Sequence, residues 1–341
     1  MMAGAVSERR WKRTDIILLM ALLSVIVWFT GDVLLLVFAG ILMAVGLDGL
    51  AGSLARYAPL SRTWALVVVG VLLMAVLALI GWTVVPQFLG QLDDLWGQMA
   101  GALEQLLETL ERHEWASGLV NDSQEQVADA AGAAVEHAAT AGLAVIGIAG
   151  SIIVLIAIAV FGAARPSLYR DGFLALLPAS NRSDMARALG ETALALRWWF
   201  LGQLISMLLL GVSVAIGLMI IGVDLWLSLG VLTALLTFIP FLGPIIAAVP
   251  IVIIGFSEGV QTGVIVLVFY IVIQNLEGNF LVPMIQHKVV NLAPALLISV
   301  QVLMGTIFGL LGLIMAAPLT VVAMVLVKHL YLEGRGEENS S

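Results

Sequence analysis

The 341-residue chain has no cysteine, and only 11% of its residues are charged. The missing cysteine excludes disulfides, thiolate metal sites and thiol nucleophiles. No Walker loop, dinucleotide-binding glycine motif or Ser-His-Asp set is visible, and no two histidines have the i, i+4 spacing of a zinc protease. The sequence therefore predicts no enzyme, no cofactor, no metal site and no nucleic-acid partner. The four histidines are His113, His137, His287 and His329.

Apolar residues are abundant instead, at 61% of the chain, and the mean hydropathy is +1.10. A soluble domain is about half apolar and about a quarter charged. Because helices satisfy their own backbone groups in lipid, this excess predicts an all-α polytopic membrane protein whose first partner is the lipid bilayer. About eight transmembrane segments are expected, at roughly 16–30, 33–47, 64–85, 143–161, 199–222, 225–256, 262–282 and 295–327.

The charges are distributed unevenly along the chain. The segment 86–141 holds ten acidic residues and one base, whereas 162–198 carries five arginines. Because positive residues stay on the cytoplasmic side, the chain is predicted to keep both termini and the 162–198 linker in the cytoplasm. The 86–141 segment is predicted to be an extracytoplasmic insert.

The insert has an apolar stripe at helical spacing, which predicts an amphipathic helix followed by a second, Ala-rich helix. This helical pair is expected to pack on itself, on the membrane surface or on a neighbouring subunit. An acidic vestibule that attracts cations is the alternative. The predicted divisions of the chain are 1–85, 86–141, 142–222, 223–330 and 331–341.

Segment lengths predict hairpins at three places. The runs 16–30 and 33–47 are each too short to cross ~30 Å of hydrocarbon, so 16–47 is predicted to be a short hairpin that turns at Gly31-Asp32. The runs 225–256 and 295–327 are too long for one crossing, and each is interrupted in the middle. Two broken hairpins are therefore expected, and single kinked crossings are the alternative. The interruptions contain Pro240, Gly243 and Pro244 in the first run and Gly309 and Gly312 in the second.

The two broken runs resemble each other in sequence. Residues 242–248 align without gaps on 311–317 with five of seven positions identical, and a proline follows each, Pro250 and Pro318. Such a pair is typical of an inverted repeat, which places broken helices and a binding site near the membrane midplane. Convergence in a chain rich in Leu, Ala, Ile and Gly is the alternative.

A polar cluster ends the 262–282 run. Glu277 stands there with the amides of Gln274, Asn275 and Asn279. Carboxylates at membrane depth are costly and are functional candidates by default, so this cluster is a predicted proton or cation carrier. A solvated carboxylate at the cytoplasmic interface is the alternative. Secondary candidates are Asp32, which is expected to cap the helix after its turn, and Gln301, which is expected to make an interhelical hydrogen bond or to line a pore.

Two blocks in the last third of the chain resemble the autoinducer-2 exporter family. The first is Phe238-Ile239-Pro240-Phe241-Leu242-Gly243-Pro244, with Pro250 downstream. The second runs from Gln274-x-x-Glu277-Gly278 through Pro283 and Leu292-x-Pro294 to Phe308-Gly309-Leu310-Leu311-Gly312 and Ala317-Pro318-Leu319. The chain departs from the family at Asn291-Leu292-Ala293-Pro294, where a histidine is usual.

The resemblance implies a transporter in the cytoplasmic (inner) membrane of a bacterium or archaeon, and a homo-oligomer. Members are assigned either to efflux of a signalling molecule or to sodium–proton antiport. The chain is therefore expected to couple an ion gradient to efflux of a small polar solute, with Glu277 as the coupling carboxylate. The alternatives are a sodium/proton antiporter and a non-transporting membrane scaffold. Pro283 and Pro318 complete the predicted hinge positions.

Overall fold

The structure is a computed structural model that describes residues 13–58, 60–75, 78–79, 82, 86, 101, 141–281 and 293–329. Every regular element in these ranges is a helix, so the predicted all-α class is confirmed for them. The elements are α1 (Arg13–Tyr57), a helix at Arg62–Ala75, α4 (Ala141–Ala164), α5 (Pro166–Ala175), the 3₁₀ turn η1 (Ala179–Asn181), α6 (Arg182–Ile221), α7 (Trp226–Thr237), α8 (Leu242–Ser257), α9 (Val260–Leu276), the π-helical η2 (Glu277–Leu281) and α11 (Pro294–Val327).

Four helices are long and apolar enough to cross a membrane: Thr30–Tyr57, Arg182–Ile221, Val260–Asn279 and Pro294–Val327. A fifth candidate is the pair Gly150–Ala164 and Pro166–Ala175, which is bent by 87°. The chain is thus a multi-pass membrane protein. The count of eight segments stays a prediction, as does the outer location of the 86–141 insert, which lies almost wholly outside the described residues.

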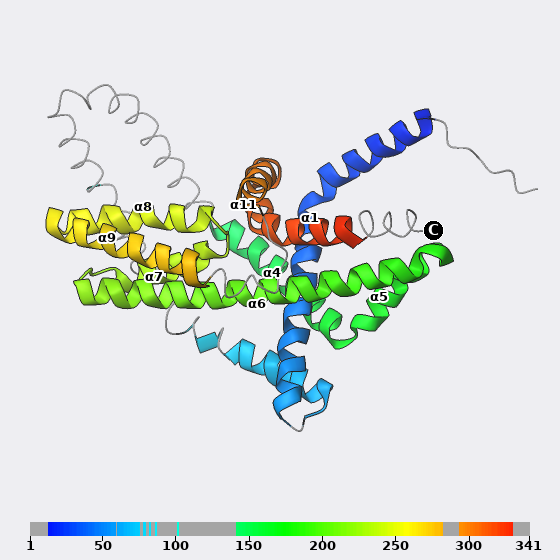
Figure 1. Cartoon of the computed structure of the whole chain (residues 1–341), viewed down its shortest axis with the longest axis horizontal. Coiled ribbons are helices and arrows are strands. Elements are labelled where there is room, and N and C mark those ends of the chain that lie inside the picture. Colours follow the sequence, from blue (N-terminus) through cyan, green and yellow to red (C-terminus); the bar gives the residue numbers. More distant parts are fainter. Residues whose placement is uncertain are drawn as a thin grey trace, which may run out of the picture.

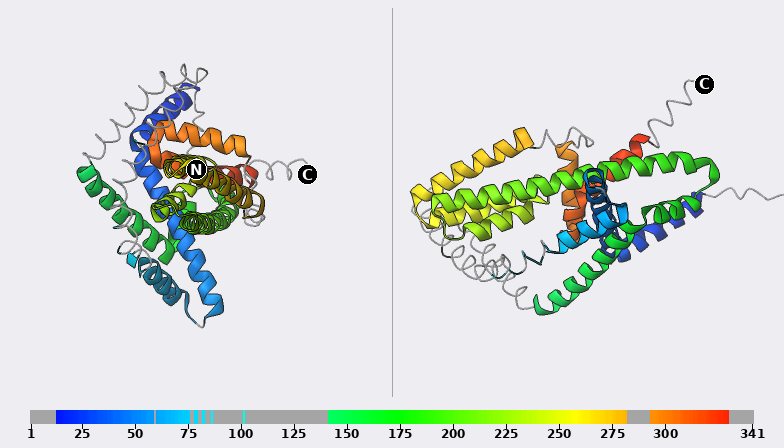
Figure 2. Two further views of the ribbon diagram at one scale, coloured as in Figure 1. Left: turned by 90° about the vertical axis from the view of Figure 1, so that its left-hand side faces the viewer. Right: turned by 90° about the horizontal axis from the view of Figure 1, so that it is seen from below.

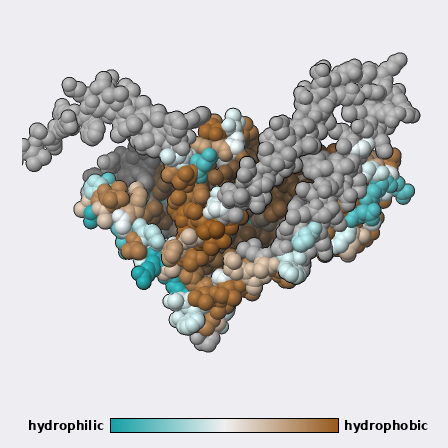
Figure 3. Space-filling model, turned by 180° about the vertical axis from the view of Figure 1, so that it is seen from behind, coloured by the Kyte–Doolittle hydropathy of each residue, from teal (hydrophilic) through white to brown (hydrophobic). Residues whose placement is uncertain are grey.

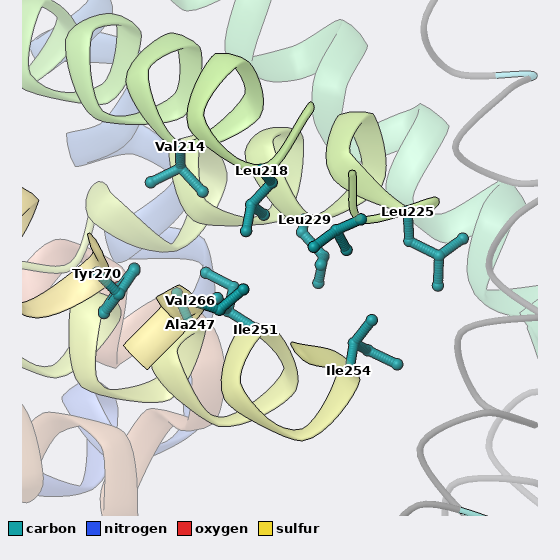
Figure 4. Packing of buried hydrophobic residues seen from close by; sticks show 10 residues of the cluster. Val214, Leu218, Leu225, Leu229, Ala247, Ile251, Ile254, Val266 and Tyr270 are labelled. Atoms are coloured by element: carbon teal, nitrogen blue, oxygen red, sulfur yellow. The ribbon is translucent and has the colours of Figure 1, made fainter. Parts of the chain in front are cut away.

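Helices α6, α7, α8 and α9 form an elongated bundle. They lie lengthwise beside one another in Figure 1, and the left panel of Figure 2 looks down their axes. Side chains from all four helices meet in one apolar core, where Leu218, Leu229, Ile254 and Val266 are fully buried (Figure 4). Burial of each such side chain contributes roughly 1.5–3 kcal/mol, so this core holds the four helices together.

Helix α1 crosses the bundle and connects it to the rest of the molecule. It packs along α4 and also contacts α6 and α11, and it runs steeply across α6 in Figure 1. Seen from behind, apolar side chains cover the middle of the molecular surface and hydrophilic ones lie toward its edges (Figure 3). That distribution suits a protein whose middle is solvated by lipid.

The predicted hairpin at 16–47 is wrong. Helix α1 runs without interruption from Arg13 to Tyr57, so Gly31-Asp32 makes no turn. A Cβ at position 31 would lie 2.1 Å from Cε1 of Phe308. Gly31 therefore allows α11 to approach α1 closely, and its role is packing. A glycine followed by aspartate can thus mark a close contact between two helices, and it does not always mark a turn.

The predicted 225–256 hairpin corresponds to two short helices in the structure, and its path through the membrane stays a prediction. Helices α7 and α8 have 12 and 16 residues, which makes them ~18 and ~24 Å long, and each is too short to cross ~30 Å alone. They pack against each other. The start of α7 and the end of α8 meet where the Asp224 N–H donates to Oε1 of Glu258 at 3.1 Å. Gly222 (φ 98°) and Gly259 (φ 130°) let the chain enter and leave this hairpin in conformations that other residues rarely adopt.

The predicted 295–327 run is interrupted in the structure. Gly309 has φ 60° and ψ −146°, which interrupts α11. A Cβ on Gly312 would lie 2.2 Å from the carbonyl oxygen of Met304, although residues eight apart in a continuous helix are ~12 Å apart. The second arm of α11 therefore folds back along the first, and how the two arms cross the membrane stays a prediction.

The predicted 162–198 linker is helical. It contains α5, η1 and the first four turns of α6, a helix of 40 residues that continues into the predicted 199–222 span. Arg197 lies inside this helix and donates to the Gly49 carbonyl at 2.6 Å and to Ser53 Oγ at 2.9 Å. These bonds fix α1 against α6 where the polar and apolar parts of α6 meet.

The closure of the first hairpin is expected to depend on pH. Burial raises the pKa of Glu258 above its usual value of 4.5, and the nearby Asp224 carboxylate adds to this effect against the opposing Asp224 N–H bond. A raised pKa means that this contribution to stability is complete below pH ~4.5 and is lost as the pH rises through the raised value. The distance between spin labels on α7 and α8 should therefore shorten on acidification. Glu258→Gln should remove this dependence, whereas Asp184→Asn should leave it intact.

Candidate functional site

The break between α7 and α8 is a tight turn of four residues. Phe241 has φ 65° and ψ −55°, and the Leu242 N–H donates to the Pro240 carbonyl at 2.8 Å, which closes a three-residue γ-turn. This conformation is strained for a residue with a side chain. A Cβ on Gly243 would lie 1.8 Å from the Leu236 carbonyl oxygen, so only glycine fits at that position. The sequence thus dictates where the hairpin turns.

The Pro240 carbonyl receives a second donor from another helix. Its helical partner would be the N–H of residue 244, but Pro244 has none. The Nε2 of Gln301 donates to this carbonyl instead, at 2.9 Å. Gln301 lies on α11 and is fully buried, and its Oε1 has no hydrogen-bond partner in the described part of the chain. The interhelical bond predicted for Gln301 is confirmed.

Two further side chains hold carbonyls of the same turn. The Nε2 of Gln203 on α6 donates to the Thr237 carbonyl. The Tyr270 hydroxyl on α9 donates to the Pro244 carbonyl at 2.7 Å. The tip of the hairpin is thus held by α6, α9 and α11 together, and we call Gln203, Tyr270 and Gln301 the tip clamp. A buried backbone acceptor without a donor costs ~1–3 kcal/mol, which explains why polar side chains stand inside an apolar bundle.

Removing one arm of the tip clamp should destabilise the hairpin. Gln301→Met keeps the side-chain volume but leaves the Pro240 carbonyl with its γ-turn bond alone. We expect the free energy of unfolding to fall by about 1 kcal/mol, the typical net value of one hydrogen bond. Thermal denaturation in detergent measures this change. Gln261→Met, at an exposed position of α9, is the matched control, and an equal loss there would contradict the role of Gln301.

Glu277 lies where the α-helix of α9 changes into the π-helix η2, which packs against α6. Only 9% of its surface is exposed, and no hydrogen-bond or ion-pair partner of its carboxylate occurs among the described residues. Short π-helical segments are frequent at functional sites. A buried carboxylate without a partner is costly, so its retention requires a reason beyond packing.

Gln274 shares the helix face of Glu277, and Tyr270 lies one turn before it. Residues 270, 274 and 277 follow the spacing that lines up side chains along a helix. The Nε2 of Gln274 is buried and has no partner in the described ranges. Glu277 is ~10 Å beyond Tyr270 along the helix axis, on the side away from the Asp224–Glu258 closure. The tip clamp therefore separates the carboxylate from the other end of the bundle.

The structure does not bring all four predicted cluster residues together. Asn275 and Asn279 are exposed, and each donates to the carbonyl four residues earlier, at 2.8 and 2.9 Å. Their amides are occupied on the outer face of the helix. Gln274 and Glu277 alone turn into the protein. A single turn of helix thus divides a cluster that looks continuous in sequence.

The structure supports some of the remaining predicted positions and contradicts one of them. Asp32 is exposed within the continuous α1, so its expected capping role is wrong. Gly309 interrupts α11, and Gly312 on the returning arm packs against Met304 of the first arm, as expected for a broken helix. Pro318 is buried inside the second arm of α11. Pro283 lies outside the described residues.

Sequence reasoning missed Gln203 and Tyr270. The available signal was weak, because each is one polar group in an apolar run, and a run of this kind tolerates isolated polar residues. Nothing in the spacing shows that both reach the same turn as Gln301. Among the described residues, no three His, Asp or Glu side chains gather as metal ligands.

An all-helical, multi-pass architecture with broken helices and buried polar groups at a hairpin tip is typical of helical membrane transporters. Comparison with known proteins identifies the particular family. The family described as AI-2E family transporter matches residues 16–332, and the chain belongs to this family. The resemblance seen in the sequence is therefore confirmed.

Three relatives support this assignment. "Putative transport protein YueF" of Bacillus subtilis is 26% identical over 278 residues, which cover 75% of this chain and 73% of the relative. "Putative transport protein sll0060" of Synechocystis is 25% identical over 283 residues, 78% of this chain and 79% of the relative. "Putative transport protein YrrI" of Bacillus subtilis is 30% identical over 154 residues, 45% and 44% of the two chains. The family and these names mark the chain as a membrane transporter.

Proposed function

We propose that the chain is a secondary transporter that uses an ion gradient to export a small polar solute, with Glu277 as the coupling carboxylate. The observation that carries this proposal is the burial of Glu277 without a partner among the described residues, two turns beyond the Tyr270 that holds the tip of a broken hairpin. A site that must load and release a cation needs a carboxylate that no permanent cation neutralises. The transport names of the relatives support the same class.

The proposed mechanism is alternating access around the two hairpins. Gly243 and Gly312 each follow a break and each pack against a carbonyl of the preceding arm, at 1.8 and 2.2 Å from the ideal Cβ position. Ala247 and Ala316, which align in the sequence repeat, are both fully buried. These correspondences support two related hairpins that exchange which side of the site is open. The proposal places the chain as a homo-oligomer in the cytoplasmic membrane, with both termini in the cytoplasm and Glu277 at the inner mouth of the site.

Sodium–proton antiport is the second candidate function. The Glu277 carboxylate and the amide oxygen of Gln274, which lies on the same helix face, are the kind of oxygen ligands that hard cations prefer. Purified protein in sealed vesicles separates the candidates. A sodium gradient that changes the internal pH without an organic solute supports antiport, whereas solute-dependent flux supports efflux. A scaffold shows no flux with any gradient, and that result would contradict both transport proposals.

A further inference from the structure

A cavity of about 600 Å³ lies between the two arms of α11. It is separate from the tip clamp and from Glu277, since none of those residues lines it. One wall is a stripe of residues spaced four apart on the first arm, and the other wall is a stripe on the returning arm. The lining includes Leu296, Val300 and Met304 on the first arm and Thr320, Ala323 and Lys328 on the second.

Among the described residues that line this cavity, no uncharged polar group is free to bind a solute. Thr320 is the one uncharged polar residue of the lining, and its hydroxyl already donates to the Ala316 carbonyl at 2.7 Å. All other lining residues except Lys328 are apolar. A polar solute would lose its hydration there without replacement, so the cavity does not suit the transported molecule.

The dimensions and the charge of the cavity match one kind of molecule. Residues 296 and 304 are ~12 Å apart along the first arm, which is close to the ~15 Å that one leaflet contributes to the hydrocarbon core. Lys328 carries the one charge of the lining and stands at the end of α11, where a lysine reaches the membrane interface. The sequence predicts that this end faces the cytoplasm, and the cytoplasmic leaflet is the one rich in anionic lipid.

We infer that an anionic phospholipid of the cytoplasmic leaflet binds here, with an acyl chain between the arms of α11 and its phosphate at Lys328. The charge complementarity favours this occupant over a zwitterionic lipid, and the apolar walls favour a hydrocarbon chain over a peptide. Because the lipid separates the two arms of the second hairpin, it would keep that hairpin in its observed spacing. The inference does not depend on Glu277 or on the direction of transport.

Fluorescence quenching by brominated lipid tests this site directly. Since the chain has no cysteine, Val300→Cys places one fluorophore inside the groove, and Val302→Cys places one on the same arm at a position that is 57% exposed. In phosphatidylcholine vesicles that contain a small fraction of brominated phosphatidylglycerol, the label at 300 should be quenched at a lower fraction than the label at 302. Lys328→Gln should require about fivefold more phosphatidylglycerol for the same quenching.

Several outcomes would overturn the inference. Equal quenching curves at the two positions would show that no lipid is enriched in the groove. Brominated phosphatidylcholine that matches phosphatidylglycerol would remove the role of Lys328, and brominated oleic acid that matches it would assign the groove to a free fatty acid. Ala323→Trp fills the groove and should abolish the difference between the labels. The quenching needs no flux, so its failure is distinguishable from failure of the proposed transport function.

Discussion

Gly243→Ala is expected to prevent correct closure of the α7–α8 hairpin. The new Cβ would lie 1.8 Å from the Leu236 carbonyl oxygen, a backbone atom that cannot move aside without moving α7. Overpacking of this kind costs roughly 1–3 kcal/mol even among flexible side chains, and here the neighbour is rigid. We therefore expect a cost of at least about 3 kcal/mol, seen as a large fall in the melting temperature and in the yield of folded protein.

Gly172→Ala is the matched control for this substitution. Gly172 lies within α5, and an added Cβ there meets nothing within 4 Å. Alanine in an exposed helix should be neutral or stabilise it by ~0.5–1 kcal/mol. A Gly243→Ala variant that is as stable as Gly172→Ala would contradict the close approach at the first hairpin turn.

The same comparison tests the likeness of the two hairpins. A Cβ on Gly312 would lie 2.2 Å from the Met304 carbonyl oxygen and 2.7 Å from the Cβ of Phe308. Gly312→Ala should therefore be destabilising for the same physical reason as Gly243→Ala. Two glycines at aligned sequence positions that both pack on a backbone carbonyl are stronger support for a repeat than five identical residues in an apolar chain.

The breaks in the two hairpins were predictable from sequence because they follow from the covalent structure of proline and glycine. A proline has no N–H, and two prolines four apart leave a carbonyl that no helix can satisfy, whatever surrounds it. The span length adds an independent constraint, since an apolar run of 32 residues would form a helix of ~48 Å, longer than the ~30 Å of hydrocarbon that one crossing needs. The break at Pro240–Pro244 thus follows from the local sequence and does not depend on tertiary contacts.

The predictions that failed concern residues whose roles depend on contacts with distant parts of the chain. Whether Gly31 turns the chain depends on Phe308, which is far away in sequence. Whether Asn275 belongs with Glu277 depends on which face of α9 meets α6. Gln203 acquires its role from a carbonyl 34 residues later. Each of these properties is set by packing between helices, and a hydropathy pattern that is apolar on all sides does not show which face is buried.

Glu277→Gln is expected to abolish ion-coupled flux while the protein remains folded. The substitution keeps the shape of the side chain and removes the group that would bind and release a cation. Because the carboxylate is buried without a partner among the described residues, its neutral amide should leave the melting temperature unchanged or raise it. We expect at least a tenfold loss of flux in vesicles that contain the same amount of inserted protein, measured by internal pH and solute content.

Two companion variants decide whether this loss reports coupling or damage. Glu277→Asp keeps a titratable group about one methylene shorter, and should retain part of the flux. Asp32→Asn removes the exposed carboxylate of α1 and should leave flux intact, because that side chain lies away from the protein interior. Full flux in Glu277→Gln would end the proposed role of this residue. Equal losses of flux in Glu277→Gln and Asp32→Asn would instead show that flux depends on the net charge of the protein. The buried position of Glu277 would then have no special role.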